Sequence, residues 1–183
     1  MLIQATTRSI AKFGYSGTTI ERICAEAGVS RGLINHHFGS KERLVLHAYR
    51  QLCEEWVRYT QGSVDANADP AEVLRDAIEK NFDTAVVKTE SLGVWLGFWS
   101  VIPKSSELQK LDRALYKADL LHFQTLFERV ASKRRIKLDA RLQAIGLLAL
   151  IEGLWLQRTL DAKSLSMDEA RAACLATVAH LLD

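Results

Sequence analysis

The stretch GYSGTTIERICAEAGVSRGLINHHFGSKERL, residues 14–44, decides the fold of this chain. It predicts two short helices joined by a sharp turn, AEAGVS, and then the capped beginning of a third helix. Gly28 stands where a helix end needs a left-handed residue, and Val29 supplies the hydrophobic contact that accompanies such an end. Ser30 is placed to cap the helix that follows. The spacing therefore predicts a tight helical hairpin.

The first helix of this hairpin has one apolar face. Thr18 and Glu21 have the spacing of a capping box at its front. The apolar residues that follow recur at i, i+3, i+4 and i+7, namely Ile20, Ile23, Cys24 and Ala27. This period is typical of a helix that packs one side against a core.

The second helix is about two turns long, and its free face is polar. We expect Ile34 and Phe38 to be buried. The side chains expected to point outward are Arg31, Asn35 and His36, with His37 near the edge. A short helix held by its neighbour, with base-contacting side chains on its free face, is the layout of a helix-turn-helix DNA reader. A helical hairpin in an unrelated bundle is the alternative.

These residues resemble the TetR family of bacterial one-component repressors. The matching positions are Gly14-Tyr15, Thr18-Thr19-Ile20, Ala27-Gly28-Val29-Ser30, Phe38 and Lys41-Glu42. Asn35 departs from the pattern, because most members have a Tyr there that reaches a phosphate. The run GLINHHF is similar to the branch that represses glycine-betaine synthesis genes and responds to choline. VWLGFWSVIP (residues 94–103) and ALIEGLWLQRTL (residues 149–160) resemble the same branch.

Composition and charge agree with an all-α DNA-binding protein in two parts. The chain has 183 residues, of which 48% are hydrophobic and 25% charged, and no segment alternates with the period of a strand. We expect a helix-turn-helix domain at 1–45, with the reading motif at about 19–38, and a ligand-binding and dimerisation domain at 46–183.

Residues 1–50 hold seven basic and three acidic residues, a net charge of +4. The rest of the chain holds 17 basic and 19 acidic residues, a net charge of −2. Phosphate binding by one end requires such a basic end.

Several other classes of protein find no support in the sequence. It contains no glycine-rich phosphate loop, no nucleophile motif and no spacing of metal ligands, so we expect neither an enzyme nor a cofactor or metal. The longest apolar run, residues 145–156, is interrupted by Glu152 and is too short to cross a membrane. The scattered cysteines and the lack of a signal peptide favour a reducing cytoplasm.

The remaining helices are expected at 1–13, 41–62, 70–88, 90–102, 106–133, 139–161 and 166–182. The segment Gln61–Pro70 is the clearest break, and Pro103 should end the helix before it. Ser166 and Glu169 form a second capping box. The basic cluster at 133–137 has two interpretations: placement beside helix-end carbonyls, which we favour, or a nucleic-acid patch.

For DNA reading, Arg31 suits a guanine edge and Asn35 an adenine edge in the major groove. His36 and His37 would reach a base or a phosphate, although His36 as plain surface and His37 as partly buried packing remain alternatives. Groups expected to hold phosphates and fix the register are Lys41 and the backbone amides of Thr18, Thr19 and Ser40, and Ser30 is a further candidate DNA-binding residue.

Because one short helix reads few bases, we expect a homodimer on palindromic double-stranded DNA. The last two helices supply candidate interface residues. These are Leu142, Ile145, Ala149 and Gly153 on the first, and Leu175, Val178 and Leu182, with Cys174, on the second. Without a partner the same residues would be internal core, and the resemblance to the family favours the dimer.

Aromatic residues suggest what the body senses. Trp95, Phe98 and Trp99 share one helix face, and Trp155 follows Glu152 in an apolar helix. Rings near one carboxylate describe a receptor for a quaternary ammonium ion such as choline, and its candidate residues are Trp95, Phe98, Trp99, Tyr116, Glu152 and Trp155. Two alternatives remain open: core packing, and a pocket for bulky drug-like or lipid-like molecules that control an efflux gene.

Overall fold

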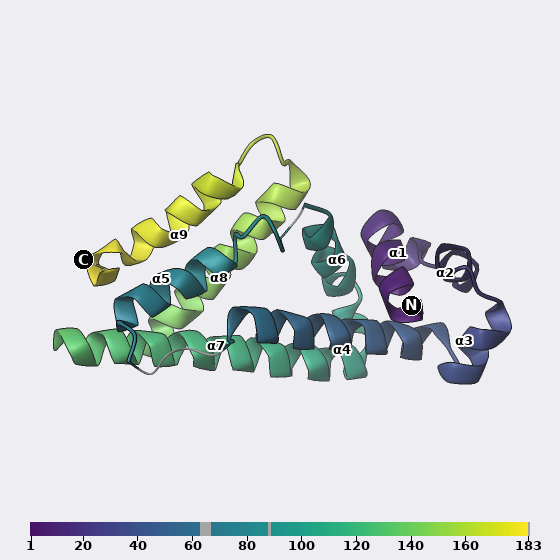
Figure 1. Ribbon diagram of the computed structural model, residues 1–183, viewed down its shortest axis with the longest axis horizontal. Coiled ribbons are helices and arrows are strands. Elements are labelled where there is room, and N and C mark those ends of the chain that lie inside the picture. The colour runs from purple at the N-terminus through teal and green to yellow at the C-terminus, as the bar shows by residue number, and fades with distance from the viewer. Residues whose placement is uncertain (63–66, 88, 183) are drawn as a thin grey trace. The chain divides into compact units, whose positions relative to one another are not determined.

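The structure, a computed structural model, describes residues 1–62, 67–87 and 89–182, with side chains throughout these ranges except at 89–91. Residues 63–66 of the expected break and Lys88 of the expected 70–88 helix lie outside the described residues. Within the described part every regular element is helical, which confirms the all-α class (Figure 1). The elements are α1 (Leu2–Gly17), α2 (Ile20–Ala27), α3 (Arg31–His37), α4 (Lys41–Thr60), α5 (Pro70–Lys80), α6 (Thr89–Trp99), the 3-10 turn η1 (Ile102–Lys104), α7 (Ser106–Arg134), α8 (Ala140–Leu160) and α9 (Met167–Leu182).

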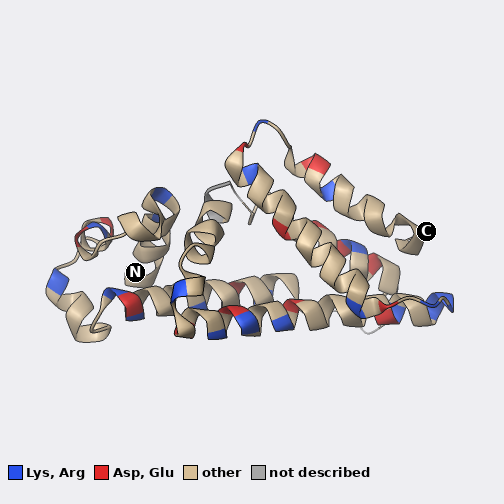
Figure 2. Ribbon diagram, turned by 180° about the vertical axis from the view of Figure 1, so that it is seen from behind, with Lys and Arg blue, Asp and Glu red and all other residues tan. Residues whose placement is uncertain are grey.

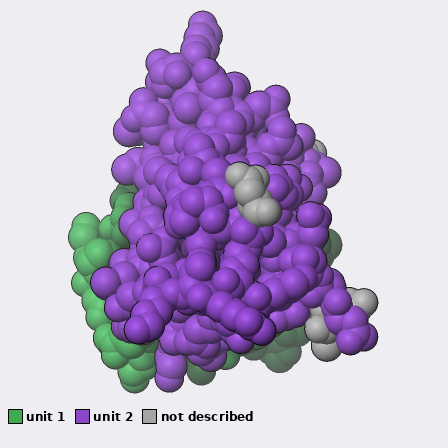
Figure 3. Space-filling view, turned by 90° about the vertical axis from the view of Figure 1, so that its left-hand side faces the viewer, with its two compact units in different colours: residues 1–55, 88–114 green, residues 56–87, 115–183 purple. Residues whose placement is uncertain are grey.

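The chain forms two compact units, coloured separately in Figure 3. Unit 1 comprises residues 1–55 and 88–114, and unit 2 comprises residues 56–87 and 115–183. These compact units therefore follow a different division from the expected domains at 1–45 and 46–183. In sequence, α4 and α7 each contribute to both units, because the unit boundaries fall inside these two helices.

The first three helices of unit 1 share a small core with the start of α4. Its buried side chains are Leu2, Ala5, Ile23, Ile34 and Leu44. Ile20, Cys24 and Ala27 pack against this core, as the spacing predicted. The turn between α2 and α3 also has the expected form, because Gly28 is left-handed at φ 67° and its N–H donates to the Cys24 carbonyl. The hairpin is thus held by apolar contacts and a glycine turn.

The expected N-terminal caps of the two helices of this hairpin need correction. Thr19, not Thr18, caps α2, since its hydroxyl accepts a hydrogen bond from the Arg22 N–H at 3.3 Å. Thr18 is buried, and its hydroxyl instead donates to the Gly14 carbonyl at 2.8 Å. Ser30 occupies the N-cap position of α3 but makes no side-chain capping bond. Thr18 has the capping-box spacing to Glu21, but its contacts with distant residues bury it, and the neighbouring Thr19 caps the helix instead.

Two faces of α6 give it close packing within unit 1. On one side Gly97 lies against Ile10 of α1, so closely that a Cβ at Gly97 would come within 2.5 Å of the Ile10 Cγ2. On the other side Trp95 and Phe98 pack against Tyr49 of α4, with ring centroids 6.1 and 4.7 Å from the Tyr49 ring. The helix ends at Trp99, earlier than expected, and Pro103 lies in η1 instead. The residue before a proline is disfavoured in helical geometry, so the α-helix stops short of it.

Unit 2 is built around α5, α8 and α9, with α9 packed against both of the others. Asp69 caps α5 by accepting from the Ala71 N–H at 2.9 Å, and its other oxygen pairs with Lys133 at 2.6 Å. One cation of the basic cluster therefore serves a structural contact between α7 and the beginning of α5. The expected capping box of α9 is confirmed, since Ser166 and Glu169 exchange hydrogen bonds at 2.8 and 3.1 Å. Of the described helices, none is both long and apolar enough to pass through a bilayer.

Candidate DNA-reading surface and effector site

The outer face of α3 has the exposure that the sequence predicted. Ile34 is fully buried and Phe38 is half-buried against the core. The side chains that point away from this core are Arg31, Asn35, His36 and His37, all of them exposed. His37 is therefore surface rather than packing, and its ring meets the His36 ring edge-on at a centroid distance of 5.0 Å. We call these four residues the reading face.

Arg31 is held in place by a neighbour on α2. Its Nη1 lies 3.1 Å from the Glu21 carboxylate, and both side chains are about two-thirds exposed. The pair is solvent-screened and contributes little to stability. It leaves Nη2 and Nε available, and two N–H groups on a rigid fork are what bidentate contact with a guanine edge needs.

Lys41 has a structural partner as well as its expected role at a phosphate. Its ammonium donates to the Thr18 carbonyl at 3.0 Å and lies 4.5 Å from the centre of the Tyr15 ring. An ammonium has three donors, so two remain for a phosphate oxygen. Burial raises the pKa of Tyr15, and the nearby Glu42 carboxylate raises it further. Lys41 thus ties the end of α1 to the beginning of α4.

One of the expected phosphate ligands is excluded by geometry. The Thr18 N–H already donates to the carbonyls of Gly14 and Tyr15, at 3.1 and 3.2 Å, and the residue is buried. Thr19 is exposed, and the Ser40 hydroxyl accepts from the Arg43 N–H at 3.2 Å, as a cap of α4 does. Thr18 therefore belongs to the frame of the hairpin rather than to its DNA contacts.

A basic and aromatic cluster near the end of α1 was missed by the sequence argument. The Arg22 guanidinium lies 4.4 Å from the centre of the Phe13 ring and donates to the Gly17 carbonyl at 2.6 Å. Lys12 approaches the same ring at 5.2 Å. Phe13 is 41% exposed, and both cations lie over its ring. Figure 2 shows the distribution of basic and acidic residues over the ribbon.

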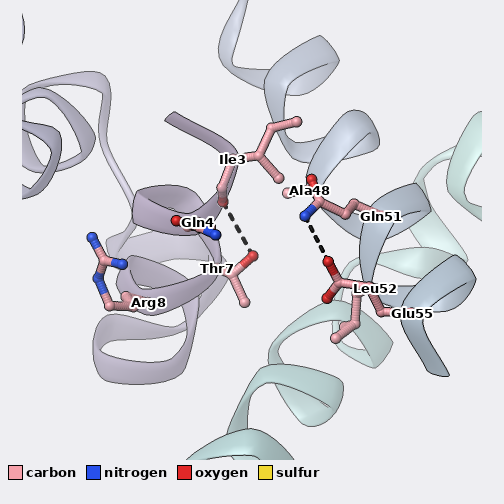
Figure 4. Close-up of a pocket in the computed structure, with 8 residues that line it drawn as sticks. All are labelled: Ile3, Gln4, Thr7, Arg8, Ala48, Gln51, Leu52 and Glu55. Atoms are coloured by element: carbon pink, nitrogen blue, oxygen red, sulfur yellow. Dashed lines mark hydrogen bonds between the residues drawn. The ribbon is translucent and has the colours of Figure 1, made fainter. Parts of the chain in front are cut away.

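A groove of about 400 Å³ runs between α1 and α4 in unit 1 (Figure 4). Its lining is mixed in character: Ile3, Gln4, Thr7, Arg8, Ala48, Gln51, Leu52 and Glu55. Gln51 donates to Glu55 at 2.7 Å, and Arg8 pairs with Glu26 at the same distance. None of the residues expected to bind an effector lines this groove.

The expected effector residues divide between the two units. Trp95, Phe98 and Trp99 lie on α6 in unit 1, whereas Tyr116, Glu152 and Trp155 belong to unit 2. Trp95 and Phe98 are buried against Tyr49, which agrees with the core-packing interpretation for these two rings. The Tyr49 hydroxyl donates to Asp112 at 2.7 Å, which satisfies this polar group of the aromatic cluster. Tyr116 is 41% exposed and Glu152 is exposed.

Trp155 stands in a different aromatic cluster, within unit 2. Its ring meets that of Trp56 edge-on at 5.0 Å, and its indole N–H donates to the Asn81 carbonyl at 3.0 Å. Nearby, the Gln61 amide donates to the Asp119 carboxylate at 2.8 Å. Trp56 and Asp119 were not among the expected effector residues. In the sequence Trp56 fits an inward-facing position of a long helix, and Asp119 is one of many charges on α7.

Comparison with known proteins agrees with this geometry. Residues 2–48 match the family of bacterial regulatory proteins called tetR, and residues 70–183 match the C-terminal domain of BetI-type transcriptional repressors. The chain belongs to the TetR family. HTH-type transcriptional regulator BetI 1 of Chromohalobacter salexigens is 36% identical over 178 residues, which cover 93% of this chain and 83% of that protein. BetI 2 of the same organism is 38% identical, over 93% of this chain and 81% of its own.

A TetR-fold regulator from Saccharomonospora viridis, solved in complex with choline, is similar throughout. Its TM-score is 0.88 at 25% sequence identity, over 98% of this chain and 94% of that chain. This chain is therefore a transcriptional repressor of the BetI type rather than an enzyme, and the resemblance inferred from its helix-turn-helix is confirmed.

In this TetR-family chain the expected dimer residues have unequal exposure. Leu142 is 63% exposed, and Ala149 and Gly153 are exposed, whereas Ile145, Leu175 and Leu182 are half-buried. Val178 and Cys174 are buried within the single chain. The expectation that these two residues lie at a dimer interface is therefore wrong.

The exposed apolar row on α8 has a different membership from the expected one. Its residues are Leu142, Gly146, Ala149, Gly153, Leu156 and Leu160, which we call the α8 seam. They recur every four and three residues, the spacing of a seam between paired helices. Nothing lies within 4 Å of the position a Cβ would take at Gly146 or Gly153, so each leaves open space on this face. Few charges occur along α8 (Figure 2).

Proposed function

We propose that this BetI-type repressor binds a palindromic operator as a homodimer in the cytoplasm, and that a small cation such as choline releases it. The reading face supports the first part, since it presents Arg31, Asn35 and His36 to solvent over a buried Ile34. Side chains that reach base edges from a short helix are what specific major-groove recognition requires.

The assignment of Arg31 to a base makes a specific prediction. After the operator is selected from random DNA, Arg31→Ala should lose about 1–3 kcal/mol of affinity for that site and little for unrelated DNA. Gel-shift titrations at two salt concentrations measure both quantities, since contacts to phosphates govern the salt dependence. Arg113→Ala, on the exposed part of α7, is the charge-matched control and should leave both affinities unchanged. An equal loss on every DNA would contradict base reading by Arg31.

The homodimer follows from the small number of bases that one reading face can contact. Specificity within a genome requires more contacts than a helix of seven residues supplies. Two-fold symmetric pairing through the α8 seam would present two reading faces to the halves of a palindrome. The seam is apolar, continuous along α8 and open to solvent in the single chain, as a surface of this kind must be.

Two observations support a cationic effector. One is the choline bound to the regulator from Saccharomonospora viridis, a protein of the same fold. The other is the presence of indole rings and carboxylates in unit 2, because aromatic faces attract a quaternary ammonium that has no N–H to donate. Release also requires that the cation bind the DNA-free state more tightly, since equal binding to both states shifts nothing.

Calorimetry with choline and with betaine aldehyde tests the effector, followed by gel shifts of the operator complex with each compound. We expect binding of at least one of them and a matching loss of bound DNA. If neither compound bound while long-chain apolar compounds did, the effector would belong to the bulky class and the cation proposal would be wrong.

A further inference from the structure

Asp119 is the carboxylate of unit 2 whose surroundings least suit an ionised group. It lies on α7, half-buried, and accepts a hydrogen bond from the Gln61 amide at 2.8 Å. Among the described residues no Lys or Arg pairs with it. Burial without a cation raises its pKa to about 7, and the charge of Glu152 acts in the same direction. Ionising a carboxylate that has no paired cation in such a place costs free energy, and pKa shifts of this kind cluster at functional sites.

The same neighbourhood contains the indole pair of unit 2. Glu152, whose charge reaches Asp119, lies one helical turn before Trp155 on α8. Trp155 contacts Trp56, and Trp56 and Gln61 both come from the end of α4 and the residues just after it. A pair of indoles in contact and a half-buried carboxylate bonded to an amide therefore come from α7, α8 and the end of α4 with the residue after it, all in a single unit. These are the components of a site for a cation that cannot donate hydrogen bonds.

We propose that Asp119 supplies the negative charge that binds the cationic effector, with Gln61 orienting its carboxylate and Trp56 and Trp155 providing ring faces. This inference rests on the proposed function and replaces Glu152 as the counter-charge. The physical reason is burial: a charge in a low-dielectric site attracts a cation more strongly than one that water and salt screen, and Glu152 is exposed.

Effector binding through Asp119 carries a proton linkage. A quaternary ammonium binds the ionised carboxylate, so below a pKa of about 7 the proton must first leave Asp119. Affinity should fall roughly tenfold per pH unit below that value and level off above it. The titratable groups around Asp119 are Glu152 on α8 and His122, one turn further on α7, whose pKa is lowered by burial and by the charge of Lys80. His122 is therefore neutral through most of this range.

The test uses the full-length protein, choline, and the neutral isostere 3,3-dimethylbutan-1-ol, with calorimetry at pH 6 and pH 8. The wild type should prefer choline to the isostere, more so at pH 8. Asp119→Asn keeps an oxygen that can accept from Gln61 but removes the charge. It should weaken choline binding about tenfold or more at pH 8, abolish the pH dependence and leave binding of the isostere unchanged.

Glu152→Gln is the matched control, since it removes a nearby charge that is exposed rather than buried. It should change choline affinity less than Asp119→Asn does, and operator binding by both variants shows that each is folded. If Asp119→Asn bound choline as the wild type does, or if Glu152→Gln alone lost the preference, this inference would be overturned while the cation proposal stood. If the wild type bound no choline at pH 8, the proposed effector itself would be wrong.

Discussion

At the scale of single residues, Asp119 links function to stability. Its pKa is raised to about 7 in the folded chain, above the ordinary value of 3.8. The folded state therefore binds a proton more tightly than the unfolded state, and this contribution to stability is complete below pH 4 and is lost as the pH rises through about 7. If the effector site needs the ionised carboxylate, the protein has a lower free energy of unfolding at neutral pH than at acid pH on account of this residue.

Replacing that carboxylate should stabilise the protein at high pH. We expect Asp119→Asn to increase the free energy of unfolding by about 1–3 kcal/mol at pH 8 and by little near pH 4. Urea denaturation at both pH values measures the difference. Asp83→Asn is the control of opposite sign, because the Tyr59 hydroxyl and the Ala85 N–H lower the pKa of Asp83. Its variant should lose stability at pH 8, and the loss should vanish below the pKa of the native Asp83. Destabilisation by Asp119→Asn at pH 8 would contradict the assignment.

The sequence predicted residues well where one helix face decides their environment. Ile34 inward and Arg31 outward follow from the period of α3 alone. Thr18 and Asp119 were different, because contacts with distant segments fix their roles. Thr18 is buried and accepts a hydrogen bond from Ser9, and Asp119 becomes unusual only when Gln61 and Glu152 are brought beside it. A local pattern contains neither partner.

At the scale of elements, α6 faces α1 with two glycines spaced four residues apart, and the packing depends on one of them. A Cβ at Gly97 would lie 2.5 Å from the Ile10 Cγ2, whereas one at Gly93 would lie 3.7 Å from the Ala11 carbonyl oxygen. The first distance is a clash with a buried side chain, and the second is ordinary van der Waals contact. The two positions therefore differ in their tolerance of a methyl group, although both lie inside the same helix.

Alanine at each position should separate these two cases. We expect Gly97→Ala to cost about 1–3 kcal/mol, because Ile10 is buried and has little room to shift. Gly93→Ala should be neutral or stabilising by up to about 1 kcal/mol, since alanine is the better helix former. Thermal and urea unfolding of the two variants measure the difference. Equal effects would show that the close approach of α6 to α1 does not limit the size of residue 97.

Helix ends were the elements' least predictable feature. The expected helix at 1–13 continues as α1 to Gly17. Gly14, at φ 65°, is non-helical inside it, and residues 15–17 form a further turn beyond this kink. The helix expected to reach residue 88 ends at Lys80, where the Asn81 amide donates to the Ala77 carbonyl and its own carbonyl accepts from Trp155. The bond from Trp155 at the end of α5 is tertiary, and the residue pattern of one segment does not contain such a partner.

At the scale of the whole molecule, the proposed function requires two copies of the chain. The amphipathic pattern predicted that α8 and α9 would be apolar but did not separate internal from external positions. Burial makes the distinction: Cys174 and Val178 complete the inner packing of unit 2, and the α8 seam remains open. An exposed apolar row of this length would promote aggregation of a monomer, whereas a symmetric dimer would bury it at the interface.

A charge in the middle of the α8 seam should therefore separate the subunits. Ala149→Glu would bury two unpaired carboxylates across a two-fold interface, and a single unpaired buried charge costs about 3–5 kcal/mol. We expect sedimentation equilibrium to show a dimer for the wild type and a monomer for the variant at micromolar concentration. Thr125→Glu, an exposed position on α7, adds the same charge elsewhere and should remain dimeric.

Operator binding connects this change to function. The Ala149→Glu monomer should bind a full palindrome no better than a half-site, because each reading face then acts alone, whereas Thr125→Glu should retain the preference for the palindrome. Gel shifts with both DNAs supply the comparison. A dimeric Ala149→Glu variant would place the interface on another surface. A monomeric variant with an unchanged preference for the palindrome would show that the DNA itself, rather than the α8 seam, brings the two subunits together.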